Sequence, residues 1–366
     1  MQIDRMTLEN FRNYQCFSQA FSPGVNLILG ENAQGKTNLL EAIYALSTGH
    51  GFRTRKEAEL VRFGQNFADL QAQITGQIRQ QTLRVVFFSG RRPKQLYLND
   101  VRRKTQGELT GVLTTVLFCP EDLSMLKAGS SGRRRFVDNG LCQLRPGYAS
   151  ALQLYNRTLE QKSRILRDRF QNPTLLEVLP EYSQRLCQVG AVLIAYRARY
   201  LDSLGKAATE YHRAFSGGRE TLEIPYRTVS TVTDPMAPTK QLEQQLLEHW
   251  QSHREAELES AQCLTGPHRD DFDGVLDGLS LKSFGSQGQT RTAAISLKLA
   301  QRQIMSRDTG EEPVLLLDDV LSELDPGRQD FVLNQIQSGQ VFITCCEPGR
   351  LTKAGQTIRI AAGKLE

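Results

Sequence analysis

A glycine-rich segment near the N-terminus has the residue types that bind phosphate. It reads Gly30-Glu31-Asn32-Ala33-Gln34-Gly35-Lys36-Thr37 and fits the pattern Gly-x-x-x-x-Gly-Lys-Ser/Thr without deviation. An apolar strand is expected before it at 25–29, and an apolar helix after it at 37–46. In such a loop the backbone N–H groups surround phosphate oxygens, Lys36 reaches the β- and γ-phosphates, and the Thr37 hydroxyl binds Mg²⁺. The segment predicts a site for ATP and Mg²⁺; a glycine-rich turn that binds nothing is the alternative.

An acidic pair, Asp318 and Asp319, follows the apolar run 314–317. Beside a phosphate-binding loop, Asp318 would hold Mg²⁺ directly or through water, and Asp319 would polarise the attacking water. We therefore expect Asp319 and Lys36 to be catalytic, and Thr37 and Asp318 to bind the metal. Taken alone, the run is equally well explained as a buried strand that ends in a polar turn.

A third segment, Ser286-Gln287-Gly288-Gln289, opens a helix expected to continue to Met305. It resembles the Ser-x-Gly-Gln signature loop of ABC-type ATPases, whose serine and N–H groups bind a γ-phosphate from outside the P-loop pocket. In isolation, a polar helix cap is the commoner explanation of these four residues. Gln289, the last of the four, lies 29 residues before Asp318 (318 − 289), and this spacing favours the signature loop over a simple helix cap. Ser322-Glu323-Leu324-Asp325 resembles the D-loop of the same superfamily.

The elements that must position these residues predict an α/β fold. Short strands are expected in a small antiparallel sheet, with a turn at Asn99-Asp100, and the buried runs read as parallel strands. The middle of the chain has helical periodicity, including a helix opened by Pro180 and one over 239–263. We predict an ABC-type ATPase head built from residues 1–120 and 265–366, with a mainly helical inserted arm domain at 121–264.

Composition excludes several classes of protein. The chain has 366 residues, of which 39% are hydrophobic and 23% charged, and its apolar runs are far shorter than the roughly 20 residues of a membrane span. None of the seven cysteines has Cys-x-x-Cys spacing, so neither a zinc cluster nor a disulfide framework is expected. We expect a reduced, cytoplasmic protein, with Cys345-Cys346 as small apolar filler.

Charge is concentrated in one segment. Residues 50–135 hold 16 Lys and Arg against 7 Asp and Glu, a net of +9, whereas the rest of the chain carries −4. Such a segment favours an anionic partner, and without a base-reading motif it predicts contact with a nucleic-acid backbone. A solvated face is the alternative for any one cluster, and Arg133–Arg135 could instead pair with internal carboxylates. The candidate contacts are Arg53, Arg55, Lys56, Arg91, Arg92, Arg102 and Arg103.

Together these motifs resemble the RecF family of bacterial DNA-repair ATPases, relatives of SMC heads. The family-specific matches are Pro120–Leu123, Arg133–Asp138 and Gly266–Asp271. Leu8–Tyr14 resembles the start of both RecF and Rad50, and matches run from about residue 3 to residue 344. The resemblance implies that residues 30–37 bind nucleotide, with Arg12 and Asn32 beside its phosphates. It also implies that Ser286 to Gln289 contact the nucleotide of the other subunit, so that ATP holds a homodimer together.

Two positions depart from the pattern of the superfamily. The acid after Asp318 is Asp319 instead of the glutamate usual in transporters, which suggests slow hydrolysis. The switch histidine is absent, and Thr344 lies near its place. Glu121 and Asp122 are the candidates for the missing Q-loop glutamine. For His268, a place near the nucleotide and a structural hydrogen bond remain equally open.

The function that the resemblance implies is ATP·Mg²⁺-driven dimerisation on double-stranded DNA at single-strand/double-strand gap junctions. Weak, DNA-stimulated hydrolysis would act as a switch that resets the dimer. With RecO and RecR, such a protein helps load RecA in recombinational repair, replication restart and the SOS response, in the cytoplasm and at the nucleoid, without a membrane. The alternatives are a transport-type ABC subunit, which the basic segment and helical insertion disfavour, and a DNA clamp with vestigial hydrolysis.

Overall fold

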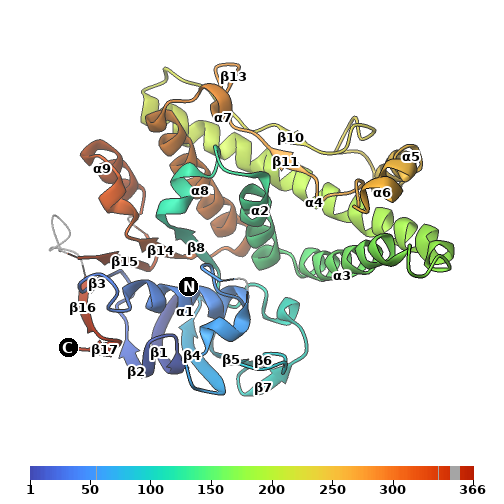
Figure 1. The fold of residues 1–366 in the computed structure, drawn as a ribbon. Helices are drawn as coiled ribbons and strands as arrows, with labels where there is room; N and C mark the ends of the chain where they lie inside the picture. The colour runs from blue at the N-terminus through green and yellow to red at the C-terminus, as the bar shows by residue number, and fades with distance from the viewer. Residues whose placement is uncertain (55, 337, 347–354) are drawn as a thin grey trace. The chain divides into compact units, whose positions relative to one another are not determined.

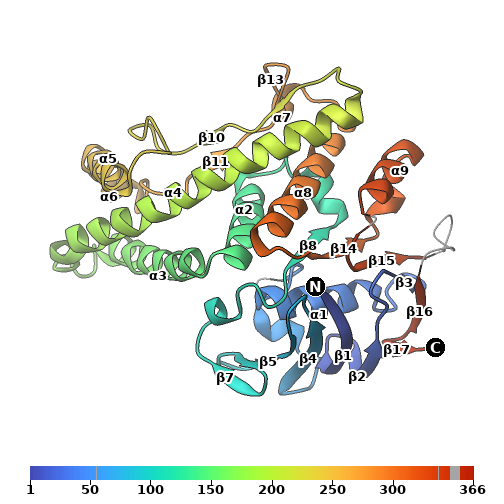
Figure 2. The ribbon, with the colours of Figure 1, turned by 180° about the vertical axis from the view of Figure 1, so that it is seen from behind.

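The computed structural model describes residues 1–366 except 55, 337 and 347–354, and the chain divides into two compact units (Figures 1 and 2). The head unit comprises Met1–Ser124 and Ala294–Glu366, and the arm unit comprises Met125–Ala293. One boundary falls inside helix α8 (Gln287–Thr309). In this division residues 265–293 belong to the arm unit, whereas the sequence-based boundary at 264/265 assigns them to the head.

The first sheet of the head unit is antiparallel and has the strand order β2-β1-β4-β5-β6-β7. Buried apolar residues alternate with polar ones along β1, so one face of the sheet packs on the core. The predicted turn between β6 and β7 is present, since Asn99 and Asp100 both have positive φ, as a tight hairpin requires. The strands are β1 (Gln2–Phe11), β2 (Tyr14–Ala20), β4 (Phe67–Thr75), β5 (Gln80–Phe88), β6 (Gln95–Leu98) and β7 (Val101–Arg103).

The second sheet of the head unit has the order β17-β16-β3-β15-β14-β8, and all its pairs except β16 with β17 are parallel. Its central strands are apolar on both faces, as expected for a covered parallel sheet. The strands are β3 (Val25–Leu29), β8 (Thr115–Phe118), β14 (Val314–Asp318), β15 (Val341–Cys345), β16 (Gln356–Ala361) and β17 (Lys364–Leu365).

Helix α1 (Lys36–Thr48) contacts β4 and β5 of the first sheet and β8, β14 and β15 of the second. It therefore lies between the two sheets, and Leu39, Leu40 and Ile43 are fully buried in the core that both sheets share. This position fixes the start of α1, which is the end of the glycine-rich loop. The head unit also contains α9 (Pro326–Gln335) and the 3₁₀ helices Glu57–Leu60, Gln106–Leu109, Pro120–Ser124 and Val320–Glu323.

The arm unit is mainly helical. Its longest helix has 42 residues and, at 1.5 Å per residue, is about 63 Å long; it packs against α3 and α5. The helices are α2 (Ser130–Leu144), α3 (Pro146–Asp168), α4 (Leu175–Ser216), α5 (Thr239–Ser252), α6 (Arg254–Ser260) and α7 (Leu281–Phe284). The strands are β9 (Leu222–Glu223), β10 (Tyr226–Arg227), β11 (Asp271–Phe272), β12 (Val275–Leu276) and β13 (Leu279–Ser280).

Two expected helices differ from the structure. Pro180 lies inside α4 instead of opening it, because Leu175, Leu176 and Leu179 pack against α3 and extend the helix beyond the proline. The helix expected over 239–263 is divided at His253, whose φ of −107° ends α5. In the described parts of the chain, no helix is long and apolar enough to cross a membrane.

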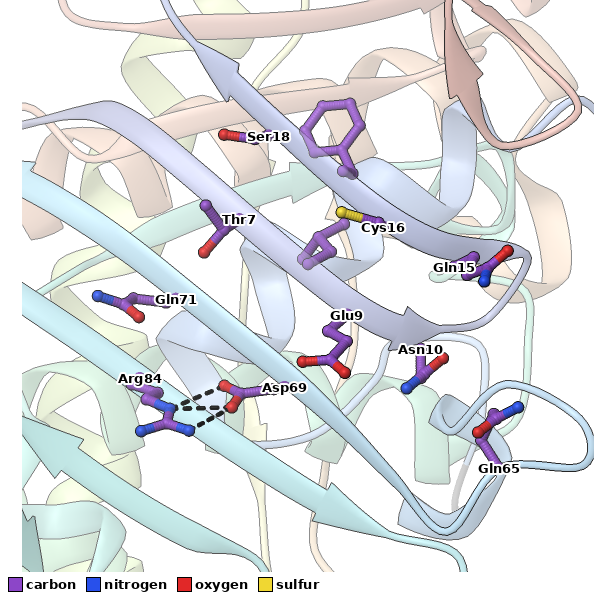
Figure 3. A pocket seen from close by; sticks show the side chains of 12 residues that line it. Thr7, Glu9, Asn10, Gln15, Cys16, Ser18, Gln65, Asp69, Gln71 and Arg84 are labelled. Carbon is purple, nitrogen blue, oxygen red and sulfur yellow. Dashed lines mark hydrogen bonds and ion pairs between the residues drawn. The ribbon is translucent and has the colours of Figure 1, made fainter.

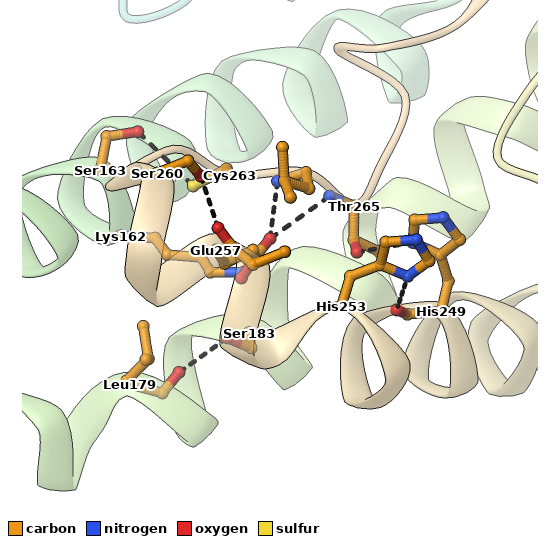
Figure 4. A network of polar contacts seen from close by, with 12 residues as sticks. Lys162, Ser163, Leu179, Ser183, His249, His253, Glu257, Ser260, Cys263 and Thr265 are labelled. Carbon is orange, nitrogen blue, oxygen red and sulfur yellow. Dashed lines mark hydrogen bonds and ion pairs between the residues drawn. The ribbon is translucent and has the colours of Figure 1, made fainter.

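A polar network fixes the ends of α5 and α6 inside the arm unit (Figure 4). Lys162 of α3 and Glu257 of α6 form a fully buried ion pair at 2.6 Å. The second oxygen of Glu257 accepts the backbone N–H groups of Leu264 and Thr265, at 2.7 and 3.3 Å. Since removing one partner would leave a buried charge uncompensated, this pair holds α6 and the following loop in one arrangement.

Candidate nucleotide-binding site

The glycine-rich loop joins β3 to α1, as predicted, and two of its glycines are required by close approach. Gly35 has a φ of 119°, and a Cβ there would lie 2.6 Å from the Asn13 amide nitrogen. A Cβ at Gly30 would lie 2.4 Å from the Ile360 carbonyl oxygen. Side chains at these positions would collide with Asn13 and with β16, so the loop could not keep this conformation.

The loop is fastened by segments from both ends of the chain. The turn between β1 and β2 contributes two hydrogen bonds: Tyr14 Oη donates to the Gly35 carbonyl and Asn13 Nδ2 donates to the Gln34 carbonyl, each at 2.9 Å. The backbone N–H of Gly363, in the β16–β17 turn, donates to the same Gln34 oxygen at 2.9 Å. The loop conformation is therefore set by the protein itself, which lowers the ordering cost of binding a ligand.

Lys36 directs its ammonium group across the mouth of the loop. Its side chain is only 4% exposed, and Nζ donates to the carbonyl oxygens of Gly30 and Glu31 at 2.6 and 3.0 Å. Nζ is also 3.4 Å from Cys346 Sγ, which contacts Asn32 Oδ1 at 3.2 Å. Cys346 is exposed, so the interpretation of this cysteine as apolar filler is wrong. The thiol lies instead beside the P-loop lysine.

Two hydroxyls converge on Asp318 at the end of β14. Thr37 Oγ1 and Thr344 Oγ1 donate to Asp318 Oδ1 at 2.9 and 3.0 Å. Burial raises the pKa of Asp318, and the two hydroxyl donors oppose that shift. A hydroxyl and a carboxylate side by side are the hard oxygen ligands that Mg²⁺ prefers. The residues present therefore fit an ATP·Mg²⁺ ligand, with Thr37 and Asp318 as the groups that would hold the metal.

Thr344 connects both acids of the predicted pair. It lies on β15 directly beside Asp318, and its hydroxyl also accepts the backbone N–H of Asp319 at 2.8 Å. Asp319 has a φ of 49°, a left-handed conformation that is uncommon outside glycine and recurs at functional sites. The sequence placed Thr344 near the expected switch histidine but assigned it no role; the structure shows a hydroxyl that orients both carboxylate residues.

Glu41 organises the cationic side of the site. This fully buried residue of α1 accepts Arg12 Nε at 2.8 Å and the backbone N–H of Arg53 at 3.1 Å. The positive charge of Arg53 lowers the pKa of Asp318, against the stronger effect of burial. Sequence reasoning missed Glu41, although a carboxylate within the apolar run 39–46 was a visible signal.

A cleft of about 830 Å³ lies beside the loop. Arg12 and Arg53 line it, together with Asn13 and Asn38, whose side chains are hydrogen-bonded to each other at 2.8 Å. Arg53, predicted as a DNA contact, therefore shares this cleft with Arg12, predicted beside the phosphates.

The signature-like segment belongs to the arm unit and forms a capping box at the start of α8. Ser286 Oγ accepts the backbone N–H of Gln289 at 3.2 Å, and Gln289 Oε1 accepts the backbone N–H of Ser286 at 3.0 Å. The helix-cap explanation is therefore correct for the local structure. Because Ser286 Oγ only accepts in this box, its hydroxyl hydrogen is left to donate to another group.

The predicted DNA contacts occupy different environments in the head unit. Arg91, Arg92 and Arg102 are exposed, as is Lys56, whereas Arg103 is half-buried. The Arg92 guanidinium lies over the Phe88 ring, 4.3 Å from its centre. Arg55 lies outside the described residues.

The outer face of the antiparallel sheet carries acidic and amide groups instead. A shallow cleft of about 750 Å³ lies on this face and includes Glu9, Asp69, Gln71 and Arg84 (Figure 3). Arg84 is paired with Asp69 by contacts that include two hydrogen bonds from Nε, at 2.9 and 3.0 Å. Among the residues that line this cleft, Arg84 is the one cation, and its pairing with Asp69 makes the cleft poorly suited to bind phosphates.

Two family-specific motifs have structural roles in the arm unit. Arg133 is buried and forms a two-pronged ion pair with Asp271, at 2.7 and 2.8 Å. Of the two explanations for the arginine cluster, pairing with internal carboxylates holds for Arg133. His268 contacts Tyr155 Oη at 2.6 Å and the Cys263 carbonyl at 3.0 Å, and burial lowers its pKa to about 4. Of the two explanations for His268, the structure therefore supports the structural hydrogen bond.

Comparison with known proteins agrees with this geometry. The family model described as the RecF/RecN/SMC N terminal domain matches residues 2–365. The DNA replication and repair protein RecF of Acetivibrio thermocellus is 38% identical over 347 residues, covering 95% of this chain and 94% of that protein. RecF of Bacillus cereus strain B4264 is 36% identical over 375 residues, covering 100% of this chain and 98% of that protein.

Solved structures show the same fold. The recombination mediator proteins RecF-ATPrS and RecF-ATP of the RecFOR pathway match with TM-scores of 0.92 and 0.91 at 32% identity. Each match covers all of this chain, and 97% and 96% of those chains. The Smc head domain of Pyrococcus furiosus matches in fold, with a TM-score of 0.54 at 14% identity, over 100% of this chain and 95% of that one.

These matches confirm the predicted fold class, an ABC-type ATPase head with a mainly helical arm. The relatives are matched over more than nine-tenths of their own length, so the similarity is not confined to the phosphate-binding motif. The chain belongs to the RecF family of DNA replication and repair proteins, within the RecF/SMC-type ATPases.

Proposed function

We propose that this chain binds ATP·Mg²⁺ in the head unit, closes as a homodimer on double-stranded DNA, and reopens after slow hydrolysis. The observation that carries the proposal is the convergence of Thr37 and Thr344 on Asp318 beside the fastened loop. RecF-ATP, a structure with 32% identity over the whole chain, supports ATP as the nucleotide.

Within one head unit, the residues would divide the work as follows. The loop 30–37 supplies backbone N–H groups for the phosphates, and Lys36 supplies a charge for the β- and γ-oxygens. Thr37 and Asp318 would hold Mg²⁺. When bound, the metal would neutralise the charge that develops on the transferred phosphoryl group. Arg12 is paired with Glu41 through Nε and donates to the Glu59 carbonyl through Nη1, so only its Nη2 group would be left to donate to a phosphate.

Asp319 would orient the attacking water and accept its proton. Its side chain is one methylene shorter than the glutamate of transporters, which is our reason for expecting slow turnover. The same shorter acid favours the second candidate, a DNA clamp with vestigial hydrolysis. The comparisons give no support to a transport-type subunit.

The dimer would form because the nucleotide needs donors from two chains. Ser286 presents a hydroxyl at the N-terminus of a 23-residue helix, where the helix dipole favours an anion. In our proposal this hydroxyl, with Gln287 to Gln289, contacts the γ-phosphate held by a second copy. ATP would then link the copies, and its hydrolysis would release them.

DNA would be contacted by cations of the head unit. The candidates are Arg91 and Arg92 between β5 and β6, Arg102 and Arg103 on β7, and Arg53, Arg55 and Lys56 near the nucleotide loop. Contacts of this kind are made to phosphates, so we expect little sequence preference and strong dependence on salt. The acidic sheet face in Figure 3 would stay outside the interface.

The biological role that we propose follows the family. RecF-ATP is placed in the RecFOR pathway, which supports RecR together with RecO as partners and, through them, RecA. The chain would then act in recombinational repair and replication restart, at the single-strand/double-strand junctions of gapped DNA, in the cytoplasm and at the nucleoid.

Fluorescence anisotropy of a labelled duplex, with and without ATP·Mg²⁺ and at two salt concentrations, tests this proposal. We expect ATP to strengthen binding by the unmodified protein but not by Lys36→Ala, and salt to weaken it. Absence of DNA binding at both salt concentrations would overturn the proposed function.

A further inference from the structure

The signature-like segment is held by two residues that sequence reasoning did not single out. Gln289 Nε2 donates to Glu220 Oε1 at 3.0 Å, and Glu220 Oε2 contacts His212 Nε2 at 2.9 Å. His212 is fully buried near the end of α4, and Glu220 follows that helix in the loop before β9. All four residues of this chain of contacts, from His212 to Ser286, belong to the arm unit.

Glu220 determines which way the Gln289 amide faces. The hydrogen bond from Gln289, followed by His212, lowers the pKa of Glu220 against the effect of burial, so the group is a carboxylate that only accepts hydrogen bonds. Gln289 must therefore present its NH₂ group to Glu220. Its oxygen is then turned to the Ser286 N–H, at 3.0 Å. His212 donates to the other carboxylate oxygen and fixes the carboxylate in turn.

The orientation matters because the two ends of an amide have nearly the same shape. Reversal would place NH₂ against the N–H of Ser286, and the capping box would lose one of its two hydrogen bonds. The other bond, from the Gln289 N–H to Ser286 Oγ, is the one that aims the serine hydroxyl hydrogen away from the helix. A loosened box would leave that hydroxyl without a fixed direction.

We propose that Glu220, held by His212, is a positioning residue that fixes the Gln289 amide so that Ser286 presents its hydroxyl to a nucleotide phosphate of a second copy. The inference rests on the proposed function for the role of Ser286 in the dimer. The orientation of Gln289 rests on contacts within the arm unit alone.

The full-length chain can be tested with three variants. Glu220→Ala removes the acceptor, Glu220→Gln retains an oxygen that can accept from Gln289, and Glu223→Ala removes an exposed carboxylate three residues away as a matched control. Each variant is assayed for ATP affinity as a monomer, for ATP·Mg²⁺-dependent dimerisation by sedimentation velocity, and for hydrogen exchange of a peptide spanning 284–291.

We expect Glu220→Ala to weaken dimerisation about tenfold or more, because a hydrogen bond to a charged group is lost in each copy. Its ATP affinity should stay within about twofold of the unmodified protein, since the P-loop belongs to the other unit. Exchange in the 284–291 peptide should accelerate. Glu220→Gln should restore most of the dimerisation and most of the slow exchange of this peptide. Glu223→Ala should change neither quantity.

Unchanged exchange in Glu220→Ala would overturn the positioning role, whatever happens to dimerisation. Faster exchange with normal ATP-dependent dimerisation would also overturn it, since the hydroxyl direction would not matter. If the unmodified protein fails to dimerise with ATP, the proposed function fails. In that case the exchange data alone decide whether Glu220 fixes the loop.

Discussion

The P-loop and the signature-like segment are built in opposite ways. The loop at 30–37 is held by Asn13 and Tyr14, by the β16–β17 turn and, through Thr37, by Asp318 at the end of β14, so its contacts come from both ends of the sequence. In the segment 286–289, Ser286 and Gln287 are exposed, and the segment is held by its own capping box and by Glu220. A site fixed by the fold can bind its ligand alone, whereas an exposed donor suits a phosphate that arrives on another surface.

The largest expected effect separates these two regions directly. Lys36→Ala should weaken ATP binding by the monomer about a hundredfold or more, since it removes a buried charged donor from the loop. Ser286→Ala should leave that affinity nearly unchanged and abolish ATP-dependent dimerisation. Calorimetric titration and sedimentation measure the two quantities. Equal losses of ATP affinity in both variants would break the contrast between the regions.

The next effect concerns chemistry within the head unit. Asp319→Asn should lower the rate of ATP hydrolysis about a hundredfold, because an amide cannot accept the proton of the attacking water. ATP affinity and dimerisation should persist, as the metal ligands are untouched. Steady-state turnover at saturating ATP provides the measurement. Equal rates for the variant and the unmodified protein would support the clamp with vestigial hydrolysis.

A pH effect on stability is expected from His268 in the arm unit. His268 has a folded pKa of about 4, below its ordinary value of 6.5, so the unfolded chain binds the extra proton between these values. The contribution of neutral His268 to the free energy of unfolding is fully present above pH 6.5 and is lost as pH falls toward 4. The free energy of unfolding should fall by about 2 kcal/mol between pH 7.5 and 5. Urea unfolding at these two pH values measures the loss.

The matched variant for this effect is His268→Gln, which keeps one donor and one acceptor but does not titrate. It should lose less stability on acidification than the unmodified protein. The same pH dependence in both proteins would show that other groups cause the acid sensitivity.

The smallest effect sharpens the description of the metal site. Thr344→Val keeps the shape of the side chain but removes the hydroxyl shared by Asp318 and the Asp319 N–H. We expect Mg²⁺-dependent ATP affinity to fall about fivefold, because Asp318 loses one of its two hydroxyl donors. The ATP affinity of Thr344→Val is measured by titrating Mg²⁺ at a fixed ATP concentration, with Thr357→Val on β16 as the control. A change of similar size in the control would remove Thr344 from the site.

The parts of the site that were predictable lie on short stretches of sequence. The loop residues 30–37 are contiguous because a single turn must carry all of them. The two acids at the end of β14 are adjacent because one strand end must carry both. The bounds of β3 and β14 were predictable for the same reason, since a run apolar on both faces has few alternatives in a soluble protein.

The residues that could not be predicted act through contacts distant in sequence. Glu41 meets Arg12, 29 residues away, and Glu220 meets Gln289, 69 residues away. Such pairs depend on the packing of whole elements, which periodicity does not encode. Pro180 shows the same limit, because the leucines before it continue α4 through their contacts with α3. The prediction of which cations contact DNA remains open, as exposure alone does not identify a partner.

A mixing experiment tests most directly the central claim that each nucleotide site needs the P-loop of one chain and the signature-like segment of another. Lys36→Ala and Ser286→Ala are each assayed for ATP hydrolysis alone and then as an equimolar mixture, at unchanged total protein concentration. In a mixed dimer, one site combines an intact Lys36 with an intact Ser286, so the account predicts that mixing restores hydrolysis. Activity in the mixture no greater than the mean of the two separate variants would contradict it.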